Sequence, residues 1–335
     1  MKRVGIVGLG KMGILHAGIV NQLPDSRIQA VCEKEKLVSG IAKKLLPKEV
    51  QFYNDHVEMV TKENLDAVFI TTPIGSHTPI IVDLTNLKPD LSLFVEKPLA
   101  RSTEMAKTAC EAVGNLSGVH MVGFQKRFSP LFRQAKRLID QKSIGELKFF
   151  RSSIYSSDVL REGKSWRSKG GIGGVLLDLA PHLLDIILWF FGDVQTVSSV
   201  KRRRIYSKLV DDFTHARFEF GSGLSGLMDT NWSASGYRLP EIALEIYGKD
   251  GVMTLTDDEL KIAYEGAEGR TQAFSNQSFD TSVPFLLANP EYTMEDQAFL
   301  GSHDKRTNPS PDFFEAARVN FLIDRIQTAT EESAA

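Results

Sequence analysis

The sequence predicts an α/β domain built on a doubly wound parallel sheet, followed by an α+β domain with a large, mostly antiparallel open sheet. Two observations lead to this fold class. Up to about residue 124, short apolar runs alternate with helical stretches, which is typical of a buried parallel sheet covered by helices. Beyond it, long strand-like segments follow one another through short turns such as Gly221-Ser222-Gly223, which favours antiparallel pairing.

The elements of the first half alternate regularly. The chain starts on a strand, and Pro24 and Pro47 end the first two helices because proline cannot continue a helix. We assign residues 1–124 to this first domain. Its expected strands are 2–9, 28–32, 66–71, 91–96 and 119–124, and its expected helices are 11–23, 36–46, 55–62, 79–87 and 102–113.

The second half, residues 125–335, is assigned to one further domain. Residues 262–310 contain several prolines and are expected to be irregular. The expected strands are 146–155, 194–206, 213–220, 223–232, 242–247 and 251–256, and the expected helices are 130–141, 174–191 and 311–329.

Length and composition exclude several classes of protein. A chain of 335 residues suits two domains, and a formal net charge of -2 provides no field that would recruit nucleic acid or an anionic membrane. The two cysteines, Cys32 and Cys110, form neither a disulfide framework nor a metal-spaced cluster, so no metal is expected. No signal peptide and no apolar run of about 18 residues is evident. We therefore expect a cytoplasmic protein without nucleic-acid or membrane partners.

The segment Gly8-Leu9-Gly10-Lys11-Met12-Gly13 fits G-x-G-x-x-G and lies where a strand ends and a helix begins. In a Rossmann domain, such glycines let the backbone approach a pyrophosphate, which the N–H groups of the helix N-terminus bind. Glu33 ends the second strand 20 residues after Gly13, where an acid can accept a hydrogen bond from a ribose 2′-hydroxyl. The sequence therefore predicts NAD as cofactor. The adjacent Lys34 leaves NADP open, and the alternative is a tight β–α turn without ligand.

Further cofactor contacts are expected where later parallel strands end, because open α/β sheets bind ligands at the carboxyl ends of their strands. Thr72-Pro73 follows the strand 66–71, and Glu96-Lys97 ends the strand 91–96. His77 lies near the start of the next helix. It could line the same cleft, or it could be a helix-entry residue that is hydrogen-bonded to the backbone.

Two features could supply acid–base chemistry. Lys97 lies between Glu96 and Pro98, and an X-Pro bond there can be cis and aim the preceding side chain. Asp178 and His182 are four residues apart, so a helix over 174–191 would place them on one face. A histidine titrates near neutrality and can act as a general base that a neighbouring carboxylate orients. The alternatives are a solvated lysine at a loop and a hydrogen-bonded core histidine beside a helix cap.

With these motifs in place, the sequence resembles the Gfo/Idh/MocA family, which includes glucose–fructose oxidoreductases and inositol dehydrogenases. The resemblance rests on the glycine loop, on the segments Thr72-Pro73 with His77, Glu96-Lys97-Pro98-Leu99 and Gly123 to Pro130, on Asp178-x-x-x-His182-x-x-Asp185, and on Asp211-Asp212. It covers nearly the whole chain. Ile74 departs from it, because many members carry asparagine after Thr-Pro.

The resemblance implies a catalytic trio of Lys97, Asp178 and His182, with His182 as the base. It also implies redox chemistry at a carbinol carbon of a sugar, polyol or related compound, and a C-terminal sheet that joins subunits into a homodimer or homotetramer. The second domain would then bind substrate. Further candidate substrate contacts are Arg127, Tyr155, Ser157, Trp166, Asn231 and Tyr237.

We therefore expect an NAD(P)-dependent oxidoreductase that moves a hydride between a secondary alcohol of a sugar or polyol and the nicotinamide. Two alternatives stay open from the sequence. One is an enzyme that uses bound NAD transiently in a reaction that is not redox overall. The other is a dinucleotide-sensing regulator without catalysis, which would have no need of the trio of Lys97, Asp178 and His182.

Overall fold

In the computed structural model, the described residues are 1–160, 174–237, 239–264, 266, 271–275 and 290–329. They form two compact units, each with its own sheet. The first contains Met1–Phe128 and the described residues of Phe279–Asn320. The second contains Ser129–Ser278 and the described residues of Phe321–Ala335.

The first unit is built on six parallel strands, β1 (Lys2–Val7), β2 (Ser26–Cys32), β3 (Gln51–Tyr53), β4 (Ala67–Ile70), β5 (Ser92–Glu96) and β6 (His120–Gly123). Their order is β3-β2-β1-β4-β5-β6. The chain therefore winds outward in both directions from the adjacent pair β1 and β4. The carboxyl ends of this pair form the switch point at which doubly wound sheets bind ligands.

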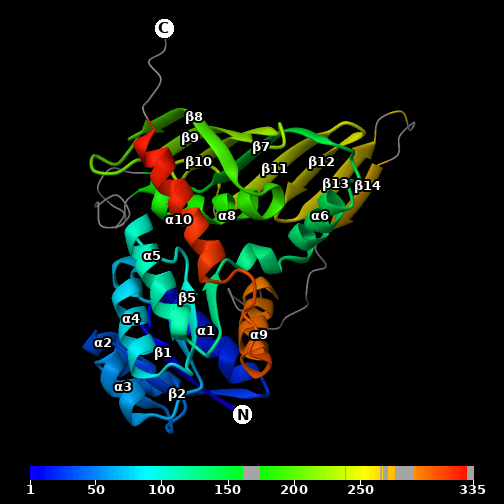
Figure 1. Cartoon of the computed structure of the whole chain (residues 1–335). Coiled ribbons are helices and arrows are strands. Elements are labelled where there is room, and N and C mark those ends of the chain that lie inside the picture. The colour runs from blue at the N-terminus through cyan, green and yellow to red at the C-terminus, as the bar shows by residue number, and fades with distance from the viewer. Residues whose placement is uncertain (161–173, 238, 265, 267–270, 276–289, 330–335) are drawn as a thin grey trace. The chain divides into compact units, whose positions relative to one another are not determined.

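Helices cover both faces of this sheet. They are α1 (Lys11–Gln22), α2 (Lys36–Leu45), α3 (His56–Lys62), α4 (His77–Leu87), α5 (Thr103–Ala112) and α9 (Pro290–Lys305), with 3₁₀ turns at η1 (Ile74–Ser76), η2 (Val113–Asn115) and η3 (Gln125–Phe128). Figure 1 shows α4 and α5 on one face and α1 and α9 on the other. All four residues of β4 are buried, as are those of β5, because both faces of these central strands are covered.

The second unit is built on eight strands, β7 (Leu147–Tyr155), β8 (Val194–Arg203), β9 (Phe213–Phe220), β10 (Ser225–Asn231), β11 (Glu241–Gly248), β12 (Gly251–Thr256), β13 (Glu259–Tyr264) and β14 (Thr271–Ser275). Their order is β14-β13-β12-β11-β7-β10-β9-β8. Only the pair β10–β7 is parallel among the pairs of this described sheet.

One face of the second sheet is covered by α6 (Pro130–Asp140), α7 (Val175–Asp178) and α8 (Ala180–Phe191). Figure 1 shows α6 and α8 on this face. Burial alternates along the strands: on β10, Met228 and Thr230 are buried, whereas Leu227 and Asp229 are partly exposed. The sheet thus has one core face and one open face, as a one-sided antiparallel sheet should. A last helix, α10 (Phe313–Thr328), begins in the first unit and ends in the second.

The expectation that residues 262–310 are irregular was wrong. The hairpin β13–β14 and the helix α9 lie within or across this range. The prolines misled the prediction at α9, because Pro290 stands at its first position. At the first helical position an N–H has no intrahelical acceptor, so proline loses no hydrogen bond there. A proline can therefore begin a helix as well as end one.

The expectation of one continuous helix over 174–191 needs a smaller correction. The segment is divided into α7 and α8 at Leu179. The break has a local cause, because Pro181 lacks an N–H and its ring would clash with a carbonyl of the preceding turn. Leu179 keeps helical torsion angles (φ -98°, ψ -45°), so the interruption is confined to one residue.

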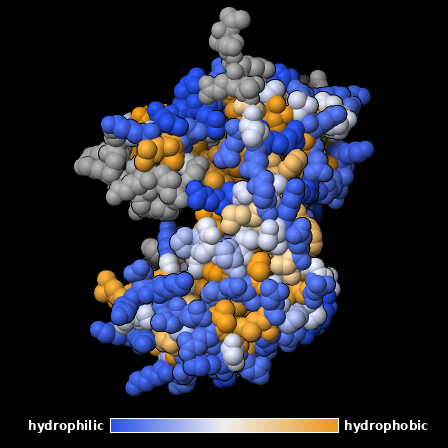
Figure 2. Space-filling model, turned by 60° about the vertical axis from the view of Figure 1, so that its left-hand side comes forward, coloured by the Kyte–Doolittle hydropathy of each residue, from blue (hydrophilic) through white to orange (hydrophobic). Residues whose placement is uncertain are grey.

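The surface is largely hydrophilic on the side shown in Figure 2, with apolar side chains in small groups. The large exposed apolar residues belong to separate elements, for example Ile14 on α1, Leu37 on α2 and Phe321 on α10. Within the described residues, no helix is both long and apolar enough to span a bilayer.

Candidate active site

The glycine-rich loop has the tight geometry that the motif predicts. Gly8 has a φ of +94°, a left-handed conformation that favours glycine. A Cβ on Gly13 would lie 2.0 Å from the carbonyl oxygen of Gly8, so any side chain there would displace the loop. At Gly10, by contrast, no atom of the described residues, apart from Gly10 and its chain neighbours, lies within 4 Å of the position of a Cβ. The first and third glycines therefore serve packing, whereas the second leaves open space.

The N-terminus of α1 is suited to an anion. Its N-cap residue, Gly10, makes no side-chain capping bond, and its first turn carries no acidic residue. In contrast, α3 and α5 are capped by the side chains of Asp55 and Ser102. Lys11 is exposed and Met12 is half-buried at the start of α1. The uncapped N–H groups and the space above Gly10 fit the pyrophosphate of a dinucleotide.

Glu33 connects the end of β2 to the glycine loop. Its Oε2 accepts the N–H of Leu9 at 2.6 Å, and its Oε1 accepts the N–H of Glu35 at 2.8 Å. The carboxylate is therefore held beside the loop, at the position where the sequence predicts contact with a ribose. Because it is an acceptor, it suits a hydroxyl group and disfavours a phosphate.

The ends of β4 and β5 are tied together by His77, which is 1% exposed. Its Nε2 lies 2.8 Å from the carbonyl oxygen of Thr72, and its Nδ1 lies 3.1 Å from that of Pro98. Burial lowers the pKa of His77 more than these carbonyls raise it. The contacts match the alternative reading of His77 as a residue bonded to the backbone, and they bring the Thr72-Pro73 motif beside the Glu96-Lys97 motif. The Lys97–Pro98 peptide is cis.

Asp178 and His182 lie on a segment that is otherwise buried. From residue 174 to residue 188, every residue except these two is buried, and both are partly exposed. Two polar side chains, four residues apart, thus reach the surface on one side of a core segment. Lys97 belongs to the first unit, and Asp178 and His182 belong to the second.

The start of α7 is set by a neighbouring loop. Gly174 has a φ of +81°, and a Cβ there would lie 2.9 Å from the carbonyl oxygen of Asp211. That oxygen accepts the N–H of Val175 at 2.9 Å. Asp178 is therefore three residues from a backbone bond that attaches the helix to the loop before β9.

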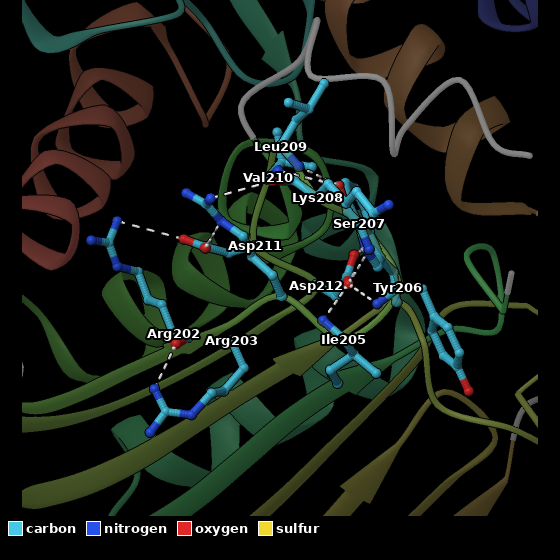
Figure 3. Close-up of polar contacts among 12 residues, drawn as sticks. Arg202, Arg203, Ile205, Tyr206, Ser207, Lys208, Leu209, Val210, Asp211 and Asp212 are labelled. Carbon is cyan, nitrogen blue, oxygen red and sulfur yellow. Dashed lines mark hydrogen bonds and ion pairs between the residues drawn. The ribbon is translucent and has the colours of Figure 1, made fainter. Parts of the chain in front are cut away.

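This loop is organised by the buried carboxylate of Asp212, which Figure 3 shows among the backbone groups that it binds. Its Oδ2 accepts the N–H groups of Ile205, Tyr206 and Ser207 at 2.7, 2.6 and 2.8 Å. Its Oδ1 accepts the indole N–H of Trp232 at 2.8 Å. One side chain thus accepts three backbone amide donors of the turn and fixes its conformation.

The candidate substrate residues differ in their surroundings. Tyr155 and Tyr237 are neighbours, with ring centroids 5.3 Å apart, in the second unit. Arg127 is 4% exposed in the first unit, where its Nη1 donates to Ser310 at 2.9 Å and lies 3.1 Å from a carboxylate oxygen of Glu315. Trp166 lies outside the described residues.

Both halves of the chain match known protein families. A profile described as "Oxidoreductase family, NAD-binding Rossmann fold" matches residues 2–124, and one described as "GFO/IDH/MocA C-terminal domain" matches residues 132–254. The chain belongs to the Gfo/Idh/MocA family of oxidoreductases. Its first sheet is therefore that of an NAD-binding Rossmann domain, and the predicted fold class is confirmed.

Relatives of known activity include polyol and anhydrosugar dehydrogenases. The chain is 27% identical over 256 residues to the scyllo-inositol 2-dehydrogenase (NAD(+)) of Bacillus subtilis, covering 74% of this chain and 72% of that protein. It is 26% identical over 309 residues to the levoglucosan dehydrogenase of Pseudarthrobacter phenanthrenivorans, covering 81% and 78%. A solved levoglucosan dehydrogenase, in complex with NADH and levoglucosan, has a similar fold with a TM-score of 0.88, 22% identity and coverage of 99% and 98%.

Sequence reasoning missed one buried group that holds these elements and assigned no role to another. His16 was not singled out, although a histidine among the apolar residues of α1 is a signal for a buried polar contact. Asp212 was noticed only through the family resemblance. Its four donors come from residues 205–207 and 232, and no local pattern connects them.

Proposed function

We propose that the chain is an NAD-dependent dehydrogenase that oxidises a secondary alcohol of a sugar or polyol. The observation that carries the proposal is the partial exposure of Asp178 and His182 on a segment that is otherwise buried. The activities of the inositol and levoglucosan dehydrogenases similar to this chain support the same substrate class. When bound, NAD would supply the hydride acceptor.

Each member of the trio has a proposed role. His182 takes the proton of the substrate hydroxyl, because imidazole is a base near neutral pH. Asp178 orients the imidazole and stabilises the positive charge that forms when His182 takes the proton. The Lys97 ammonium polarises the substrate oxygen, where negative charge develops as the proton leaves. Tyr155 and Tyr237 are proposed substrate contacts, and for Arg127 and Trp166 that role stays a prediction.

NAD is proposed as the cofactor used in the cell, in preference to NADP. The support is the position of the Glu33 carboxylate, which is held beside the glycine loop by the N–H groups of Leu9 and Glu35. A 2′-phosphate near this carboxylate would meet like charge. Gly10, Lys11, Met12, Thr72 and Pro73 are the further proposed contacts of the dinucleotide.

We further propose a homodimer or homotetramer that forms through the second sheet. The support is its open face, opposite the face that α6, α7 and α8 cover, where apolar side chains such as Leu227 and Tyr247 are partly exposed. Light scattering on the purified protein should give two or four chains, and a monomer at micromolar concentration would contradict this.

Cys32 and Cys110 are free thiols, which supports the proposal of a reducing, cytoplasmic location.

The function is tested with a panel of substrates. scyllo-Inositol, myo-inositol and levoglucosan, together with other sugars and polyols, are incubated with NAD or NADP, and the absorbance of the reduced cofactor is followed. We expect turnover with at least one polyol or sugar and faster turnover with NAD. Binding of NAD without turnover of any compound would favour a regulator. Cofactor that copurifies and recycles without added NAD would favour a transient-redox reaction.

The roles are tested with Lys97→Ala and His182→Ala. Removing a general base or a polarising cation costs about 10²- to 10⁴-fold in kcat, whereas NAD binding measured by fluorescence should change little in His182→Ala. Lys107→Ala, at an exposed position of α5, is the matched control and should retain wild-type kcat. Near wild-type turnover in either site variant would refute the assignment.

A further inference from the structure

Four ionisable side chains meet in the core of the first unit. His16 comes from α1, Glu96 from the end of β5, and Glu295 and Asp296 from α9. His16, Glu295 and Asp296 have no exposed surface, and Glu96 is 6% exposed. The rings of Phe69 and Phe94 pack around the imidazole, with centroids 5.3 and 5.0 Å away. Such a concentration of charge in an apolar core is costly unless the groups are paired.

The contacts of His16 show how they are paired. Its Nδ1 lies 2.9 and 3.0 Å from the two carboxylate oxygens of Asp296, and its Nε2 lies 3.1 Å from Oε1 of Glu96. An ionised carboxylate only accepts hydrogen bonds, so both ring nitrogens must donate. With both carboxylates ionised, the ring is an imidazolium between them.

The electrostatics agree with this assignment. Burial by itself lowers the pKa of His16, but the charge and hydrogen bond of Asp296, followed by those of Glu96, raise it well above its usual value. Burial raises the pKa of Asp296 against the opposing charge of His16. The two short contacts between their atoms favour the ion pair, so we assign the proton to His16.

Other ionisable side chains of α9 lie near His16 and Asp296. Burial first, and then the charge of Glu96, raise the pKa of Glu295 well above its usual value, which favours the protonated form of this side chain. Tyr292 and Glu291 also face the cluster from α9, and burial keeps the Tyr292 hydroxyl protonated by raising its pKa. His16, Glu295 and Asp296 present ligand atoms within 4.8 Å of one another. A cation is nevertheless disfavoured, because both nitrogens of His16 are used in hydrogen bonds to carboxylates.

The same carboxylate that accepts from His16 also holds the backbone of Lys97. Oε2 of Glu96 accepts the N–H of Lys97 at 3.0 Å, while Oε1 faces His16. On the other side, His77 contacts the carbonyl oxygen of Pro98 at 3.1 Å. The short segment from which Lys97 projects is thus held between two buried histidines.

We propose that His16 is a positioning residue for Lys97, acting through the Glu96 carboxylate and anchored by Asp296 of α9. The inference rests on the proposed function, which makes Lys97 the group that polarises the substrate oxygen. It also explains how α9 is attached to the Rossmann sheet, because the contact joins His16 on α1 to Asp296 on α9, which are 280 residues apart in the sequence. Without His16, the Glu96 carboxylate loses its fixed orientation, and the Lys97 backbone loses its preferred geometry.

The first test measures the charge of His16 and does not depend on catalysis. Wild-type protein labelled with ¹⁵N-histidine is titrated by NMR, and the His16 resonances are assigned by their loss in His16→Asn. We expect both ring nitrogens of His16 to stay protonated at pH 8, above the usual pKa of histidine. A neutral ring at pH 8, or one tightly bound divalent ion per chain in elemental analysis, would overturn the proposal. If His16→Asn folds poorly, His16→Gln is used for the assignment in its place.

The second test measures the position of Lys97. Lysines are labelled with a limiting amount of an amine-reactive reagent, and the rate at Lys97 is read by mass spectrometry. We expect His16→Asn, which keeps a donor toward Asp296 but not toward Glu96, to alter the labelling rate of Lys97 alone. His16→Gln, which can still reach Glu96, should restore part of the wild-type rate. His56→Asn removes a partly exposed contact between His56 on α3 and Asp83 on α4 and is the matched control.

Kinetics then separate this inference from the proposed function. With the polyol that the wild type oxidises best, we expect His16→Asn to lower kcat about 10- to 100-fold, as for a misplacement of about 1 Å, and to change KM for NAD less than about 3-fold. Equal labelling of Lys97 in His16→Asn and the wild type would refute the positioning role. If the wild type oxidises no compound, the proposed function fails, whereas the NMR and labelling results still decide the role of His16.

Discussion

The replacement Asp212→Asn tests how strongly one buried carboxylate holds the loop that precedes β9. Asp212 has no exposed surface and accepts four N–H groups at 2.6 to 2.8 Å. The amide of asparagine has nearly the same shape but only one oxygen. If that oxygen stays on Trp232, its NH₂ group faces the three backbone donors of the loop.

The magnitude follows from these contacts. A hydrogen bond to a charged group contributes about 1.5–3 kcal/mol net, and three of them are lost or become repulsive. Ile205 is 51% exposed, so the loop can open to water and recover part of this cost. We therefore expect the free energy of unfolding to fall by about 3 kcal/mol, which is a decrease in Tm of about 6–12 °C for a unit of this size.

Urea unfolding, followed by the fluorescence of Trp232 and the other tryptophans, measures this loss. The control is Glu219→Gln on β9, which makes the same chemical change in an exposed pair with Arg217 and should cost no more than about 0.5 kcal/mol. We also expect lower kcat in Asp212→Asn, because the loop attaches the start of α7 through Asp211 and Val175. A free energy of unfolding within about 0.5 kcal/mol of the wild type would refute the reasoning.

Two further predictions concern the first unit. Gly10→Ala should fold normally, because no described atom beyond its chain neighbours lies within 4 Å of the new methyl group, but it should bind NAD more weakly by calorimetry. Gly13→Ala should also lower Tm, because its methyl group would lie 2.0 Å from the Gly8 carbonyl oxygen. Equal Tm values for the two variants would contradict this. The folded pKa of Glu295 is raised above its unfolded value near 4.5, so the folded chain binds more protons and wild-type stability falls as pH rises from 4.5 toward the folded pKa. In thermal unfolding, Glu295→Gln should therefore have a higher Tm than the wild type at pH 7, and this difference in Tm should vanish below pH 4. A difference in Tm that does not depend on pH would show that Glu295 is not a buried acid that must stay protonated.

The sequence by itself determined the features that depend on neighbouring residues. The alternation of apolar runs and helices predicts the parallel sheet, because burial on both faces needs continuous apolar strands. The spacing of Gly8, Gly10 and Gly13 predicts the loop, because its conformation is limited by local contacts between a Cβ and the backbone. The family motifs then identify Lys97, Asp178 and His182 as the residues to test.

Only the tertiary structure decided which distant residues meet. The contact of His16 with Asp296 joins residues 280 apart, and the parallel pairing of β10 with β7 joins segments about 75 apart. Pairs such as these carry no local signature, because a histidine or an aspartate looks the same in the sequence whether its partner is buried or absent. Such pairs form only when the chain closes its long loops and packs its core. This packing places α9 against the Rossmann sheet and places the Asp212 carboxylate against the loop that precedes β9.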